Sequence, residues 1–314
     1  FVGSVRCVEE TVIKLADCFD FIWKCNGINS KKRSYLIMKV LIRFCLLSLV
    51  FIFFRCASED KIPLNLKKEY PEALTISAKN ELNLLRGEAT VMLDVIKIKE
   101  KSPVFNEKAF VVWCDNEELP SQAIDSDGDG RMDQIIVISD FKPKEQKILR
   151  LLYIQIGEKR REYPKRTQAE LSHKVDGEFV NRKYQGGTFQ NVQFLRVPPE
   201  HTDHSFFIRY EGPGWESDKV GYRFYLDWRN AIDIFGKKVP DMVLQDIGQD
   251  GFDSYHEMAD WGLDIFKVGN SLGLGSFGMW YQNKANRVEK TDSITCSILE
   301  NGVIYSQIRT QYYG

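Results

Sequence analysis

Residues whose types could do chemistry gather in one stretch, residues 201–238, which reads HTDHSFFIRYEGPGWESDKVGYRFYLDWRNAIDIFGKK. Successive side chains of a β-strand point to opposite faces, so a strand over residues 221–229 would have two different faces. One face is predicted to join the core and carries Tyr222, Phe224, Leu226 and Trp228. The other face is predicted to line a site and carries two cations, a phenol and a carboxylate, from Arg223, Tyr225, Asp227 and Arg229.

Histidines and acidic residues near this strand supply candidate general acids and bases. Imidazole titrates near neutral pH without help, so His204 is a candidate acid or base, with a hydrogen-bonded turn residue as the open alternative. For His201 the turn role is favoured. His256 is an alternate acid or base in a glycine-containing segment. Glu216 and Asp218 are further alternates, as a carboxylate pair for glycoside hydrolysis.

Charge and metal ligands narrow the function classes. The net charge of −1 gives no sign of a nucleic-acid partner held by bulk charge. A catalytic metal held by His201 and His204 is a weaker alternative, because such a site needs three protein ligands and no third His or Cys lies near in sequence. No cofactor is required by the chemistry predicted here.

An acidic loop lies between two predicted strands of the first half. Residues 125–133 read DSDGDGRMD and match the first nine positions of an EF-hand-type calcium loop. Ile136 occupies the twelfth position, where a bidentate Glu is expected. The alternatives are therefore a structural calcium site and an acidic hairpin that needs no metal. The candidate ligands are Asp125, Asp127, Asp129 and Asp133.

The elements that must position these residues are short strands separated by turn residues. This pattern favours an all-β fold, an antiparallel β-sandwich. Predicted strands in the first half cover residues 75–84, 89–98, 110–114, 134–139 and 148–156. A charged stretch with a proline, residues 158–166, is the predicted boundary between a smaller N-terminal β module (75–160) and the main module (165–314) that carries the candidate site.

The N-terminal segment resembles an export signal. Met38 opens MKVLIRFCLLSLVFIFFRCASED, whose apolar run would be only about 16 Å long as a helix, too short to span a bilayer. Cys56 has the place of the lipidated residue in a bacterial lipoprotein signal over residues 38–58, which predicts an outer-membrane lipid anchor. A soluble periplasmic or secreted protein is the alternative. Residues 1–37 are interpreted as non-native upstream translation, and residues 59–74 as a linker.

Two segments carry a resemblance to a known family. EGPGWESDKVGYRFYLDWRNAIDIFGK and PSQAIDSDGDGRMDQIIV resemble DUF4861, an uncharacterised family of secreted proteins from Bacteroidetes-type bacteria. The resemblance implies a role beside polysaccharide-degradation systems, often those for glycans rich in uronic acids. It also implies a large β-sandwich, the supersandwich of sugar mutarotases and some polysaccharide lyases. Family members are longer than this chain, so a C-terminal truncation is expected.

The resemblance and the strand face together suggest roles for the site residues. Arg223 and Arg229 would hold the carboxylate of a uronate, because guanidinium pairs with carboxylate through two hydrogen bonds. His204 or Tyr225 would act as base or acid in a β-elimination, and Asp227 would orient one arginine. Further substrate contacts are predicted from Trp215, Tyr222 and Arg209.

Three functions stay open at this stage. The preferred one is an enzyme that acts on an acidic oligosaccharide or polysaccharide by β-elimination, and the second is a glycan-binding lipoprotein without turnover. The third is a hydrolase that uses Glu216 and Asp218. Indole rings are good platforms for sugar rings, so one or two of the four tryptophans of the main module are expected to be exposed in a cleft. These are Trp215, Trp228, Trp261 and Trp280.

Overall fold

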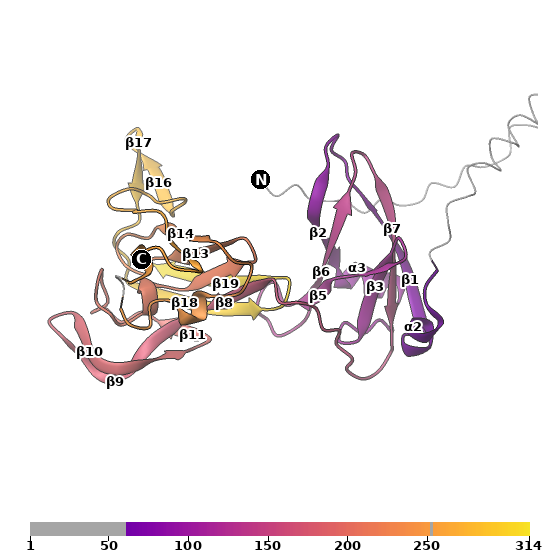
Figure 1. Ribbon diagram of the computed structural model, residues 1–314, viewed down its shortest axis with the longest axis horizontal. Helices are drawn as coiled ribbons and strands as arrows, with labels where there is room; N and C mark the ends of the chain where they lie inside the picture. The colour runs from indigo at the N-terminus through magenta and orange to yellow at the C-terminus, as the bar shows by residue number, and fades with distance from the viewer. Residues whose placement is uncertain (1–60, 252–253) are drawn as a thin grey trace, which may run out of the picture.

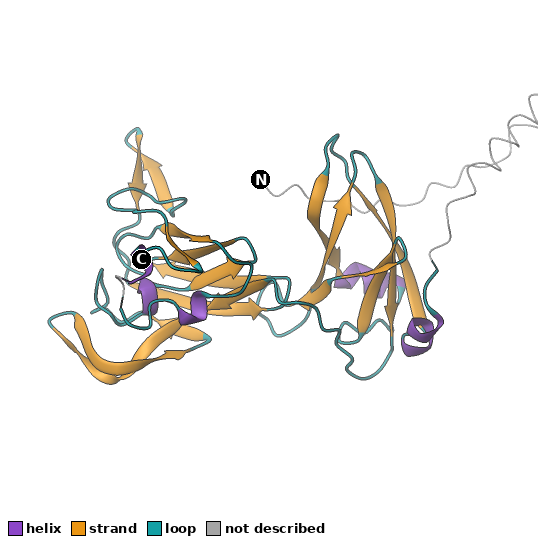
Figure 2. Cartoon of the chain, in the orientation of Figure 1, coloured by secondary structure: helices purple, strands orange, loops and turns teal. Residues whose placement is uncertain are grey.

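The computed structural model describes residues 61–251 and 254–314. The predicted export signal, Cys56 and residues 1–37 lie outside this range. Within it the sheets are antiparallel and helices are few, so the prediction of an all-β, antiparallel sandwich fold is confirmed (Figure 2). No helix of the described ranges has the length and apolar character that a membrane crossing needs.

The first module is a sandwich of two sheets (Figure 1). One sheet has the order β1-β7-β3-β4, with bounds Glu72–Lys79, Gln146–Tyr153, Phe110–Cys114 and Glu117–Leu119. The other has the order β2-β6-β5, with bounds Arg86–Asp94, Gln134–Phe141 and Ser121–Ile124. A short helix, α2 (Leu64–Glu69), covers the outer face of β3, where Leu66 packs with Val111 and Trp113.

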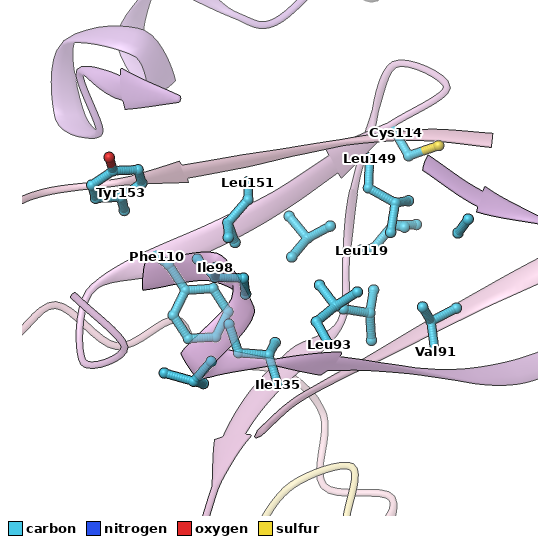
Figure 3. Close-up of a cluster of buried hydrophobic side chains, with 14 of the residues drawn as sticks. Val91, Leu93, Ile98, Phe110, Cys114, Leu119, Ile135, Leu149, Leu151 and Tyr153 are labelled. Atoms are coloured by element: carbon cyan, nitrogen blue, oxygen red, sulfur yellow. The ribbon is translucent and has the colours of Figure 1, made fainter. Parts of the chain in front are cut away.

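The core of this first sandwich is apolar (Figure 3). Every second residue from Ala89 to Leu93 of β2 is buried, as the period of a half-buried strand requires, and Val91 and Leu93 pack with Leu149 and Leu151 from the facing sheet. The predicted strand over residues 89–98 is wrong in its second half. Asp94 caps a helix there, α3 (Val95–Lys101), by accepting a hydrogen bond from the backbone N–H of Lys97 at 3.1 Å.

The second module is built on a five-stranded sheet of order β15-β14-β13-β12-β8. In chain order its strands are β8 (Thr167–Glu170), β12 (Gly214–Ser217), β13 (Val220–Phe224), β14 (Ile232–Lys237) and β15 (Gly262–Asp264). A three-stranded sheet of order β11-β18-β19 faces it, with bounds Phe194–Arg196, Ser293–Asn301 and Ser306–Tyr313. An apolar cluster that includes Ala169, Leu226, Cys296 and Ile298 contains side chains from both sheets.

Two hairpins and three short 3-10 helices complete this module. Hairpin β9–β10 covers Ser172–Val180 and Lys183–Asn191, and hairpin β16–β17 covers Gly278–Tyr281 and Lys284–Arg287. The 3-10 helices are η2 (Arg209–Glu211), η3 (Leu244–Asp246) and η4 (Ser254–His256). Hairpin β16–β17 projects from the rest of the module in Figure 1.

Residues 154–166 join the modules without a helix or strand. The main contact between modules is made by the β5–β6 region and the β18–β19 turn. Gln122 accepts hydrogen bonds through Oε1 from the backbone N–H groups of Ile304 (3.1 Å) and Tyr305 (3.2 Å), and Ile124 packs with Ile304. Cys114 and Cys296 are both buried, and neither forms a disulfide bond.

Candidate functional site

Strand β13 is shorter than predicted, and its faces are reversed. It ends at Phe224, and residues 225–230 turn so that β14 runs back beside β13, with Arg223 opposite Asp233. Arg223 is only 2% exposed, whereas Tyr222 and Phe224 are half-buried. The charged face is therefore the buried one, and the aromatic face is the more open one. The prediction that the aromatic face is the core face of β13 is wrong, and the charged face is buried because its partner charges come from other strands.

Arg223 is the centre of a buried hydrogen-bond network. Its Nη2 lies 2.6 Å from Oδ2 of both Asp233 and Asp264, its Nε donates to Asp233 at 3.0 Å, and its Nη1 donates to the hydroxyl of Tyr255 at 2.9 Å. Tyr225 donates to the same Asp233 oxygen at 2.8 Å. Since the guanidinium is buried and bonded through all three nitrogens, it presents no free edge to a uronate.

Protonation in this network follows from burial. Burial raises the pKa of the Asp264 carboxyl to about 6, with Arg223 opposing that shift and Asp233 adding to it. Burial also raises the pKa of the Tyr225 and Tyr255 phenols well above their ordinary value. The Tyr225 hydroxyl is therefore neutral near pH 7 and already bonded to Asp233, so it is poorly placed to act as a base.

A second group, here called the Arg229 cluster, contains Asp203, His204, Glu211, Asp227 and Arg229. Arg229 bonds to Asp227 through its Nε and Nη2 groups, and its terminal nitrogens lie 3.0 Å from both Asp203 Oδ1 and Glu211 Oε2. Its guanidinium also lies 3.7 Å from the centre of the Tyr225 ring. The Arg223 guanidinium lies 4.7 Å from the centre of the same ring.

His204 forms the open side of the Arg229 cluster. Its side chain is 46% exposed, and its Nδ1 lies 3.0 Å from Asp203 Oδ1. Its backbone N–H donates to Glu211 Oε1 at 2.7 Å. His204 and Glu211 both have positive φ angles, 57° and 71°, which cost free energy in non-glycine residues and occur at many functional sites.

The Arg229 cluster has an excess of negative charge. Three carboxylates face one guanidinium, so the sum is −3 + 1 = −2 when His204 is neutral. This charge disfavours a uronate carboxylate beside Arg229 and favours a cation. Asp203, His204 and Glu211 offer ligand atoms that all lie within 4.8 Å of one another, so these three residues could hold a divalent metal.

His201 is buried beside the same cluster. Its Nδ1 lies 2.7 Å from Ser205 Oγ, and its backbone N–H donates to Pro198 O at 3.0 Å, which agrees with the predicted hydrogen-bonded turn. Burial lowers the pKa of the imidazole to about 4, and the carboxylates of Asp227 and Glu211 only partly oppose this. His201 is therefore neutral near pH 7.

Two of the predicted site residues, Arg209 of η2 and Glu216 of β12, are buried in the second module. Arg209 is 1% exposed and pairs with Glu170 at 2.6 Å, so the predicted substrate contact by Arg209 has no exposed surface. Glu216 is 3% exposed. Its Oε1 accepts from the backbone N–H groups of Val243 and Leu244 at 2.8 Å, and its Oε2 accepts from Lys237 Nζ at 2.6 Å.

The remaining alternates lie at the edge of the module. Asp218 accepts a hydrogen bond from Arg166 Nε at 2.9 Å, so the predicted hydrolytic pair of Glu216 and Asp218 is held by separate cations and shares no cleft. His256 lies with its Nδ1 3.4 Å from Asp264 Oδ2 and its side chain 31% exposed. It thus lies beside the Arg223 network.

The open aromatic face of β13 lines a cavity of about 450 Å³, here called the aromatic cavity. It lies between this face and strand β19, and its lining residues are Trp215, Phe224, Phe277, Ser306, Gln307, Ile308, Thr310 and Tyr312. Trp215 stacks on Tyr222 at 5.6 Å between ring centres, and Phe277 stacks on Tyr312 at 6.1 Å. Of the predicted substrate contacts, Trp215 lines the cavity and Tyr222 supports it.

The acidic loop is a turn that satisfies many of its own polar groups. Asp125 accepts hydrogen bonds from the backbone N–H groups of Gly128 and Gly130, both at 2.6 Å. Asp133 accepts from Ser126 N at 2.9 Å. The grouped carboxylates that could hold a cation are those of Asp125, Asp127 and Asp129. Arg309 of β19 donates to the backbone oxygen of Asp127, so the loop contacts the strand that lines the aromatic cavity.

Several important residues were missed by the sequence reasoning. Asp233 and Asp264 complete the Arg223 network, and Asp203 and Glu211 complete the Arg229 cluster. Asp233 could in principle have been predicted from the sequence, because a turn after Phe224 brings it opposite Arg223 in an antiparallel pair. Four of the five cavity residues of β19 alternate along the strand, namely Ser306, Ile308, Thr310 and Tyr312, but no pattern within that strand indicates which sheet faces it.

Comparison with known proteins gives a family and no named relative. Searches of curated proteins and of solved structures returned no match. A family model described as a domain of unknown function, DUF4861, matches residues 78–314. This match spans both modules and most of the chain, and the chain therefore belongs to the DUF4861 family.

Proposed function

We propose that this protein is an exported, carbohydrate-active protein that binds a glycan chain in the aromatic cavity. The observation that carries the proposal is the lining of that cavity. The rings of Trp215, Phe224, Phe277 and Tyr312 supply flat apolar surfaces. The lining also contains the polar, uncharged side chains of Ser306, Gln307 and Thr310.

This lining matches the chemistry of a sugar ring. A pyranose has apolar C–H faces that pack on aromatic rings and hydroxyl groups that exchange hydrogen bonds with hydroxyl and amide side chains. None of the described residues that line the cavity carries a carboxylate, an imidazole or a cation. The cavity residues are therefore suited to binding, and any turnover needs groups from outside the cavity.

The proposal is tested by removing an aromatic surface that the fold does not require. Phe277 is 62% exposed and lines the cavity, so Phe277→Ala should weaken oligosaccharide binding about tenfold, the equivalent of about 1.4 kcal/mol. Phe194→Ala is the matched control, because Phe194 is 58% exposed in the same module and does not line the cavity. Calorimetry with a panel of acidic and neutral oligosaccharides measures the binding. Equal weakening by both variants would count against the cavity.

Turnover at the Arg229 cluster is the second candidate, favoured by the exposure of His204 beside Asp203. His204 would act as base or acid on a bound glycan whose carboxylates lie away from Arg229, so His204→Gln should abolish product formation. His173→Gln is the control, because His173 is a half-buried histidine of the same module. Products are read by mass and absorbance: an unsaturated uronate indicates a lyase, and new reducing ends without it indicate a hydrolase. Products that persist in His204→Gln would rule out this role.

Export and calcium remain proposals that rest on the sequence. Lipidation at Cys56 predicts that Cys56→Ser moves the protein from the outer-membrane fraction to the soluble fraction, and an unchanged distribution would contradict the anchor.

Structural calcium at Asp125, Asp127 and Asp129 predicts that calcium raises the melting temperature and that Asp125→Asn removes this rise. A melting temperature that does not change when calcium is added would favour the metal-free hairpin.

A further inference from the structure

Hairpin β16–β17 exposes an unusual amount of apolar surface. Phe277, Met279, Trp280 and Tyr281 are 62–74% exposed, and nearby Trp228 is 40% exposed. Large aromatic residues gathered on a surface mark an interaction site more often than scattered ones do. The hairpin also projects from the sheet beneath it (Figure 1), so these side chains are accessible to a ligand.

One face of the hairpin combines indoles with a guanidinium. The pairing puts Trp280 opposite Ala285 and Gly278 opposite Arg287, so Trp280 and Arg287 share a face. Ala285 is small and leaves the Trp280 indole 74% exposed. The Arg287 guanidinium lies 5.3 Å from the centre of the Trp228 ring, which continues the face onto the turn after β13.

Arg287 is held in place by backbone oxygens. Its Nη2 donates to the backbone oxygens of Asn270 (2.9 Å) and Ser271. Its Nε is buried and has no hydrogen-bond partner among the described residues. A guanidinium positioned in this way beside an exposed indole can attract a carboxylate.

The charge of the hairpin identifies the class of ligand. Residues 277–291 contain Lys284, Arg287 and Lys290 against Glu289, so the segment carries 3 − 1 = +2 in a chain of net charge −1. An anionic ligand is therefore favoured. A second copy of the chain is disfavoured, because a two-fold interface would place this positive segment against itself.

The hairpin is continuous with the aromatic cavity. Phe277 stands at the base of β16, lines the cavity and stacks on Tyr312. A chain whose units have flat apolar faces would pass from the cavity onto Trp280, and carboxylates along it would meet Arg287 on the same face. A uronic-acid-containing glycan has both features. Lys284 pairs with Tyr281 on the other face and adds positive charge at the turn of the hairpin.

We infer that hairpin β16–β17 is an outer subsite that binds the continuing chain of an acidic, uronate-containing glycan. This inference rests on the proposed function, because the same glycan occupies the aromatic cavity. The hairpin would then make the protein prefer acidic glycans over neutral ones, which Arg223 cannot do because it is buried in the core. It also makes long chains bind more tightly than short ones.

The test compares chain length and charge in the full protein. Galacturonic acid dimers and octamers and neutral glucose octamers serve as probes. Trp280→Ala should weaken binding of both octamers about tenfold and leave the dimer unchanged. Lys284→Gln should weaken binding of the acidic octamer about threefold at low salt, with no change for the neutral octamer. Lys67→Gln, at an exposed lysine of the first module, should bind like the wild type.

The outcomes separate this inference from the proposed function. If Phe277→Ala weakens binding but Trp280→Ala and Lys284→Gln bind the acidic octamer like the wild type, the subsite is overturned and the cavity stands. If the wild-type protein binds none of the probes, both are overturned. If the hairpin variants instead lose binding to anionic phospholipid vesicles or to single-stranded nucleic acid, with glycan binding intact, the hairpin serves another anion and the inference fails.

Discussion

The two modules bury different chemistry. The core of the first sandwich is an apolar cluster drawn from both sheets, with residues such as Val112, Leu149 and Leu151 fully buried (Figure 3). The second module also has charged residues in its interior: Arg209, Arg223 and several carboxylates are only 1–7% exposed. Buried ions cost desolvation free energy and repay it only when every partner is in place.

This difference separates a scaffold from a working module. An apolar core tolerates hydrophobic substitutions that conserve its volume. A buried network of ions loses most of its stability when one member is removed. Positive φ angles at His204, Phe206, Tyr210 and Glu211 fall in the second module, beside this network. The second module therefore depends on ion partners that the apolar core of the first module does not need.

The largest effect is expected from Arg223→Ala. It leaves Asp233 and Asp264 buried without their cation, and the loss should be about 3–5 kcal/mol of unfolding free energy. Denaturant unfolding followed by tryptophan fluorescence measures it. A triple variant with Arg223→Met, Asp233→Leu and Asp264→Leu should be more stable than Arg223→Ala, because it leaves no buried charge unpaired. A triple variant that is no more stable would show that the arginine acts through packing alone.

Leu151→Ala tests the other core. Deleting a fully buried leucine side chain removes apolar contacts and leaves a cavity, so the loss should be about 3 kcal/mol. The transition of the first module should move and that of the second should not. Separate transitions in the Arg223 and Leu151 variants would confirm two independent cores. A single unfolding transition that moves equally in both variants would contradict the claim that the two cores are independent.

A smaller effect should appear in the pH dependence of the free energy of unfolding. His201 has a folded-state pKa of about 4 and an unfolded value near 6.5. Its stabilising contribution is present above pH 6.5 and is lost as the pH falls towards 4, because only the unfolded state gains the proton in that interval. Asp264 acts oppositely: its folded pKa of about 6 makes stability fall as the pH rises from about 4 to 6.

The two groups can be separated by substitution. His201→Gln should flatten the loss of stability between pH 6.5 and 4 by up to about 2–3 kcal/mol relative to wild type. His173→Gln is the matched histidine control. Unfolding free energies from denaturant titrations at several pH values measure both. A wild-type slope in His201→Gln would mean that the imidazole titrates normally in the folded protein.

Local pattern predicted the fold class well. Runs such as Phe110–Cys114 and the turn residues between them indicate strands, since period and turn chemistry are local properties. The helix at Val95–Lys101 was missed because its start depends on one side chain, Asp94, capping a backbone N–H. The family resemblance was also readable from the sequence, in the segments on either side of the boundary.

The site was harder to predict, because its partners are distant in the chain. Arg223 is buried only because Asp233 and Asp264 arrive from β14 and β15. Without these partners, a strand face with two arginines is expected to be open. The aromatic cavity depends on β19, more than 80 residues after β13. Pairing between distant strands leaves no local pattern that would indicate either arrangement.

The smallest effect should come from the surface ion pairs between the modules. Glu88 of β2 contacts Arg166 at 2.6 Å and also Lys219, and its side chain is 47% exposed. Exposed pairs contribute at most about 1 kcal/mol and are screened by salt, so Glu88→Gln should barely move either unfolding transition. Unfolding at low and high salt measures this. A loss larger than that of Leu151→Ala would mean that the modules depend on this contact, and the picture of two separate cores would have to be replaced by one coupled unit.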